Sequence, residues 1–150
     1  MKKEYKRLDL ALNQLKTAIG LFTSSGDRFS VITLAGAADV ILSQHVTRQK
    51  RKNFSRMIAE QDERLSDYKT VGREINDALC INTFKHLDPG KEKYVDVNDL
   101  DACCIAAILK ALVNYKILDR QNGGILIELF RSWLSNNILF GHYVSSIEAL

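Results

Sequence analysis

Residues 8–46 carry two hydrophobic patterns that predict two kinds of helix. From Leu8 to Phe22, apolar side chains recur every three or four positions with polar and cationic residues between them. This spacing predicts an amphipathic helix of about 20 residues. Ser24-Ser25-Gly26 is typical of a helix end, and Asp27 is a suitable N-cap for the next helix. That second segment, Arg28 to about Val46, is apolar around nearly its whole circumference, so we expect it at the centre of the fold.

Asp39 interrupts this second apolar segment. A buried carboxylate must either find a partner or change its protonation state, because the charged form is costly away from water. We therefore expect Asp39 to meet an arginine, a lysine or a free helix N-terminus. The neighbouring Ala-Gly-Ala-Ala stretch would let another backbone come close to this helix.

Residues 53–86 are more polar, with sparse apolar positions. They predict one helix over about 53–62 and another over about 66–86, although a single long helix with a bend fits the same pattern. Four residues of the second helix fall at steps of three and four and share an arc of about 60°: Ile75, Leu79, Asn82 and His86. We therefore expect Asn82 and His86 to continue a buried stripe. Asp88-Pro89-Gly90 is a turn that ends this helix.

The last third of the chain predicts two more helices and an apolar tail. Residues 96–101 supply a cap and an acidic first turn for an apolar helix that runs to about Leu118. A further helix follows the break at 119–124 and ends at Asn136-Asn137. The tail, 138–150, would pack on the bundle or cover a second subunit. With one proline in 150 residues and no convincing strand, we predict an all-α single domain over residues 1–150, a bundle of five or six helices.

Composition and charge narrow the setting of this bundle. The net charge of +3 permits an anionic partner without requiring one. The charged N-terminus lacks a signal-peptide core, and the longest apolar stretches, 31–42 and 103–113, are short for a bilayer span. The three cysteines are odd in number and lack Cys-x-x-Cys spacing, which favours reduced thiols. We therefore expect a cytoplasmic protein that does not enter a membrane.

Motifs for common chemistries are missing, and one basic cluster stands out. The chain has no glycine-rich phosphate loop, no His-Glu-x-x-His and no Cys/His metal spacing. We therefore expect no metal and no cofactor. The basic cluster consists of Arg48, Lys50, Arg51, Lys52 and Arg56. It is a candidate site for RNA or phosphate, but acidic residues follow it, and a solvated loop is the alternative.

Asn82, Lys85 and His86 are the candidate catalytic residues. A histidine that titrates near neutral pH is suited to acid–base work, whereas the amide and the ammonium can position or neutralise a phosphate. The alternative is a polar helix end in which His86 bonds a backbone carbonyl or a carboxylate.

The opening half of the chain resembles the start of HEPN domains. The residues that carry this resemblance are Leu8-x-x-Ala11-x-x-x-Leu15-x-x-Ala18, then Gly26-Asp27, then Leu34-Ala35-Gly36-Ala37-Ala38-Asp39-x-Ile41-Leu42. In that family, an amphipathic helix, a Gly-Asp-like turn and an Ala-Ala-Glu-containing helix open an up-and-down bundle. Asp39 stands where the family usually has glutamate. The resemblance covers roughly residues 8–88.

Asn82 and His86 are similar to the last two members of the Arg-Asn-x-x-x-His motif of HEPN ribonucleases. In that family the arginine and histidine of two protomers converge on the scissile phosphate, so the resemblance implies a homodimer. Here the arginine position holds Ile81, which supplies neither charge nor a bidentate donor. Lys85, Arg73 or the basic cluster would have to substitute for it.

Three functions follow from these patterns. The first is a non-enzymatic HEPN-like binding or accessory module for RNA or a protein, in defence, stress response or a toxin–antitoxin setting. The second is a metal-independent ribonuclease with His86 as acid–base catalyst, Asn82 as positioning group, and Lys85 or the basic cluster as phosphate clamp. The third is a structural protein whose tail, 138–150, forms an oligomer interface.

Overall fold

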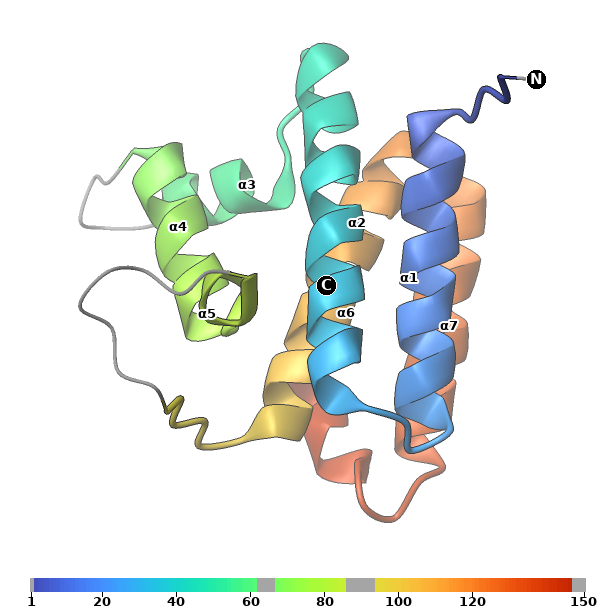
Figure 1. The fold of residues 1–150 in the computed structure, drawn as a ribbon, viewed down its shortest axis with the longest axis vertical. Helices are drawn as coiled ribbons and strands as arrows, with labels where there is room; N and C mark the ends of the chain where they lie inside the picture. The colour runs from blue at the N-terminus through green and yellow to red at the C-terminus, as the bar shows by residue number, and fades with distance from the viewer. Residues whose placement is uncertain (1, 62–66, 86–93, 147–150) are drawn as a thin grey trace.

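The computed structural model describes residues 2–61, 67–85 and 94–146, and the elements in these ranges are all helical. Within these ranges, seven α-helices and one 3-10 helix follow one another (Figure 1): α1 (Arg7–Thr23), α2 (Arg28–Arg48), α3 (Phe54–Gln61), α4 (Tyr68–Ala78), α5 (Ile81–Lys85), α6 (Leu100–Leu118), α7 (Arg120–Ser135) and η1 (Gly141–Ser146). The all-α bundle predicted from the hydrophobic pattern is confirmed. The helix count is slightly higher than the predicted five or six.

The four long helices form the bundle, and the three short ones lie beside α2 (Figure 1). The pairs α1–α2 and α6–α7 are antiparallel hairpins. In contrast, α2 and α6 run in the same direction, because α3 to α5 carry the chain back between them. Arg28 at the start of α2 pairs with Asp101 at the start of α6, and Asp39 pairs with Lys110 about three turns further along both helices.

Helix α2 is central, as its apolar circumference predicts. Val31, Ile32, Ala35, Ala38 and Leu42 are all fully buried. Within the described ranges, α2 is also the helix whose length and composition would suffice to cross a bilayer, since it is 21 residues long rather than the twelve of its apolar stretch. A buried core helix passes the same test, and the central position of α2 accounts for its composition.

Carboxylate caps mark where three of the four long helices, α2, α6 and α7, begin. The Asp27 side chain accepts from the Ser30 amide at 2.8 Å, which confirms the predicted cap of α2. Asp99 caps α6 through the Ala102 amide at 2.9 Å, and Asp119 caps α7 through the amide of Asn122.

The segment predicted as one helix over 66–86 is divided in the structure. Helix α4 ends at Ala78, Cys80 takes a left-handed conformation with φ of 58°, and α5 begins at Ile81. This break adds a helix and shifts the helical phase. Ile81 therefore turns into the core, and Asn82 is only half-buried. Ile75 and Leu79, which precede the break, are half-buried as well. The predicted stripe is therefore only partly buried along its length, and the predicted inward-facing His86 lies outside the described residues.

Candidate functional site

Ile81 attaches α5 to the central helix. Its side chain is 2% exposed and packs against Gly36 of α2. A Cβ atom at Gly36 would lie 2.7 Å from Cγ2 of Ile81, closer than real side chains approach. The glycine therefore provides the space that Ile81 fills. The position where the resemblance calls for an arginine is thus part of the hydrophobic core.

The predicted catalytic residues are not seen together as a site. Asn82 donates from Nδ2 to Oδ1 of Asp77 at 2.8 Å, so its amide is engaged by the preceding helix α4. Lys85 is the last residue of α5, but the position of its side chain is outside the described part of the structure, as is His86. Of the three side chains, only that of Asn82 is described, and its bond joins α4 to α5.

An apolar groove of about 600 Å³ lies beside α5. Phe29 of α2 and Phe84 of α5 meet edge to face in its wall, with ring centroids 5.1 Å apart. Tyr94, Val95 and Leu100 complete much of the lining. Sequence reasoning missed this groove because its residues come from three separate segments. Phe29, which the sequence places in the apolar second segment, is exposed in the structure.

A buried polar network surrounds Asp39, which the sequence singled out. Oδ2 of Asp39 accepts from Nζ of Lys110 at 2.6 Å, and its Oδ1 accepts from Nδ2 of Asn114 at 2.7 Å. Asp39 and Lys110 are each 4% exposed. The prediction that Asp39 meets an arginine, a lysine or a helix N-terminus is confirmed by Lys110. This lysine was missed because it lies inside the apolar run of α6.

The same network reaches the short helices. Nζ of Lys110 also donates to Oδ1 of Asn76 in α4 at 2.8 Å. Oδ1 of Asn114 accepts from the backbone amide of Phe54 at the start of α3, at 2.9 Å. Both buried charges and the buried amide therefore have partners, and the network joins α2 and α6 to α3 and α4. Because these polar groups are buried and bonded to one another, they join the helices and are not accessible to a substrate.

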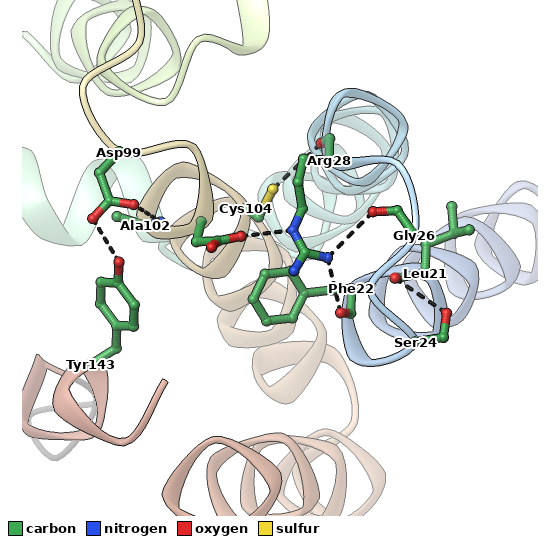
Figure 2. A network of polar contacts seen from close by, with 10 residues as sticks. Leu21, Phe22, Ser24, Gly26, Arg28, Asp99, Ala102, Cys104 and Tyr143 are labelled. Carbon is green, nitrogen blue, oxygen red and sulfur yellow. Dashed lines mark hydrogen bonds and ion pairs between the residues drawn. The ribbon is translucent and has the colours of Figure 1, made fainter. Parts of the chain in front are cut away.

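A second network lies at the N-terminal ends of α2 and α6 (Figure 2). Nε of Arg28 lies 2.7 Å from Oδ1 of Asp101, and its Nη1 donates to the carbonyl of Phe22 at 3.0 Å. The guanidinium also sits 4.4 Å from the centre of the Phe22 ring. Sγ of Cys104 donates to the Arg28 carbonyl at 3.4 Å. Arg28 thus ties the α1–α2 turn to the start of α6.

The first part of the tail packs on the bundle. The Tyr143 hydroxyl of η1 donates to Oδ2 of Asp99 at 2.6 Å (Figure 2). This bond to a carboxylate raises the pKa of Tyr143 to about 12 and lowers the pKa of Asp99. Phe140 is buried, whereas Ile138 and Leu139 are exposed. Residues 147–150 of the predicted interface segment lie outside the described residues.

The basic cluster lies at the junction of α2 and α3, and all five of its side chains are exposed. Nζ of Lys52 is 2.6 Å from Glu60, and Nε of Arg56 is 3.7 Å from the same carboxylate. Lys50 is in a left-handed conformation with φ of 57°. The cluster is therefore exposed to solvent, and two of its five cations pair with Glu60.

All three cysteines are free. Burial raises the pKa of Cys104 to about 12, and burial together with the neighbouring Cys80 raises that of Cys103 to about 11. Within the described ranges, no three His, Cys, Asp or Glu side chains gather as metal ligands would.

Comparison with models of protein families, with curated proteins and with solved structures gives no match for this chain. The likeness to HEPN domains therefore rests on the residues quoted above.

Proposed function

We propose that this protein is a non-catalytic helical binding module whose fold is related to HEPN domains. The observation that carries the proposal is the burial of Ile81. Its side chain fills the space above Gly36 in the core, so the residue that would clamp a phosphate in a ribonuclease here holds α5 onto α2. A guanidinium in this position would be a buried charge without a partner.

The surroundings of Ile81 support the same conclusion. Asn82 is bonded to Asp77, and the buried charges of the neighbouring network already pair with each other. Within the basic cluster, in contrast, Lys52 and Arg56 pair with Glu60, while Arg48, Lys50 and Arg51 are exposed and available to a partner. We therefore propose that the protein acts by binding RNA or another protein, without cutting it.

The resemblance to HEPN domains supplies the rest of this proposal. It favours a homodimer and an accessory role in defence, stress response or a toxin–antitoxin pair. A cytoplasmic location is in keeping with three free thiols.

A cleavage assay tests the absence of catalysis. End-labelled RNA is incubated with the purified protein and with the variant His86→Ala, each with and without a chelator. We expect the RNA to remain full length in every reaction. Cleavage by the wild-type protein that His86→Ala abolishes would overturn the proposal and establish the ribonuclease alternative. Cleavage that persists in the variant would point to a contaminating nuclease, which a second purification by a different route removes before the assay is repeated.

A further inference from the structure

Four helix ends meet at one end of the bundle, which we call the basic end. There α1 begins, α2 ends, α6 ends and α7 begins (Figure 1). A recess of about 480 Å³ lies between them. Residues from all four helix ends line it, among them Leu8, His45, Gln49, Tyr115, Leu118 and Arg120. The recess is thus formed by residues that are far apart in the sequence.

Positive charge is concentrated around this recess. The three segments that form the basic end are residues 2–9, 45–52 and 116–120. They hold ten of the 21 lysines and arginines of the chain, but only three of its 18 acidic residues. Lys2, Lys3, Lys6 and Arg7 at the N-terminus are exposed, as are Arg48, Lys50, Arg51 and Lys52 after α2. These three segments therefore carry a net charge of +7 (ten minus three) and the rest of the protein carries −4 (eleven minus fifteen), so the overall charge of +3 conceals an uneven distribution.

The recess has the chemistry of a site for a planar heterocycle. Leu8, Leu12 and Leu118 give it apolar walls. The imidazole of His45, the amide of Gln49, the carboxylate of Asp119 and the guanidinium of Arg120 give it hydrogen-bonding groups. The Asp119 carboxylate is itself engaged by Asn122 at the start of α7. Apolar walls with a few polar groups are typical of pockets for small planar ligands. The cations around it match a chain of phosphates. A nucleotide strand matches both features, because its bases are planar heterocycles and its backbone is a chain of phosphates.

We propose that the basic end binds single-stranded nucleic acid, with one base in the recess and the flanking phosphates on the surrounding cations. A base in a duplex is stacked and paired, so it cannot enter a recess of this kind, whereas a base in a single strand can. Tyr5, which is 65% exposed in the segment before α1, provides a ring on which a neighbouring base can stack. This partner is the one we assign to the proposed binding module, so the inference rests on the proposed function.

An anionic membrane would also be attracted by the cations, but it would not use the recess. Leu8 and Leu118 are half-buried in the recess walls rather than projecting beyond the charges. Membrane insertion needs apolar side chains that extend into the lipid. The recess therefore favours a nucleic acid over a lipid surface.

The test is a fluorescence anisotropy titration with a labelled 20-nucleotide oligouridylate, an RNA duplex of the same length, and vesicles that contain phosphatidylserine. We expect the single strand to bind more tightly than the duplex or the vesicles. Its affinity should fall steeply with salt, because each phosphate contact contributes a slope of about −0.7 in log K against log salt. Equal binding of duplex and single strand, or binding of the vesicles alone, would overturn the proposal.

Two variants locate the site. Arg48→Glu/Arg51→Glu reverses two exposed cations at the basic end, and should weaken single-strand binding roughly tenfold or more. The matched control, Lys16→Glu/Lys69→Glu, makes the same charge change at exposed positions outside the basic end, and should have a much smaller effect. Equal losses in the two variants would show attraction to net charge alone and refute the site.

Gln49→Trp tests the recess itself, because the indole would fill it while all the cations remain. We expect this variant to lose the preference for single strands and to keep the weaker binding of duplex. An unchanged preference would refute a base in the recess. Gel analysis of the RNA recovered from these titrations separates the two proposals: degraded RNA would contradict the non-catalytic function, whereas absent binding would contradict only the basic-end site.

Discussion

Removing the amine of Lys110 should destabilise the protein far more than removing an ion pair of the same length on its surface. Lys110 and Asp39 are each 4% exposed, and their charged atoms are 2.6 Å apart. The substitution Lys110→Met keeps most of the side-chain volume but removes the charge. It leaves a buried carboxylate with Asn114 as its remaining partner, and it deprives Asn76 of its donor.

The size of the effect follows from the cost of an uncompensated buried charge. Breaking a buried ion pair by removing one partner typically costs about 3–5 kcal/mol. The matched control is Lys52→Met. The Lys52–Glu60 pair is also 2.6 Å long, but its side chains are 56% and 46% exposed, so water solvates both charges. We expect the control to change stability very little.

Urea denaturation followed by circular dichroism measures both free energies of unfolding. The double variant Asp39→Leu/Lys110→Met completes the comparison, because removing both charges avoids leaving one unpaired. It should recover much of the stability lost in Lys110→Met. The reasoning would be refuted if Lys110→Met and Lys52→Met lost similar amounts, or if the double variant were less stable than Lys110→Met.

Three further predictions follow from the same structure. Ile81→Arg should lower the free energy of unfolding by at least about 3 kcal/mol, because it places a larger, charged side chain in the core. Thermal denaturation tests this, and an unchanged melting temperature would contradict the position of α5. The bond from Tyr143 to Asp99 favours the neutral phenol, so its contribution to stability is present below pH 10 and is lost as the pH rises through about 12. In an ultraviolet titration, Tyr143→Phe should therefore remove a phenol that ionises near pH 12, and loss of one that ionises near pH 10 would be the contrary result. The pKa values of Cys103 and Cys104 are raised to about 11 and about 12. Both thiols should therefore react slowly with iodoacetamide at pH 8 in the native protein and rapidly in urea, which mass spectrometry measures. Fast labelling of both in the native protein would argue against their burial.

Local patterns predicted three of the four long helices well. Helix α7 differs, because it begins at Arg120 and therefore includes most of the stretch 119–124 that was expected to be a break between helices. The three- and four-residue spacing from Leu8 to Phe22 gave α1 within a residue or two, and Asp27 marked the start of α2. The lone carboxylate of Asp39 in an apolar run predicted a buried partner, because the cost of burying a charge does not depend on the rest of the fold. These features depend on interactions within one helix or on one side chain.

Features that depend on tertiary contacts were not predicted. The break at Cys80 has no glycine or proline to announce it, and it arises where α5 turns to bury Ile81 against Gly36. Lys110 lies inside the apolar run of α6, and its pairing with Asp39 follows only from the packing of α2 against α6. The basic end could not be predicted from the sequence either, because its cations come from three separate segments that are brought together only in the folded bundle.

The most direct test of the account is the length of RNA recovered from its complex with this protein. Labelled single-stranded RNA is bound to the wild-type protein, the complex is isolated by size-exclusion chromatography after a prolonged incubation, and the RNA is examined on a denaturing gel. A binding module whose motif position is occupied by the core residue Ile81 should yield full-length RNA that elutes with the protein. Shortened RNA from the wild-type protein, and full-length RNA from His86→Ala, would contradict it.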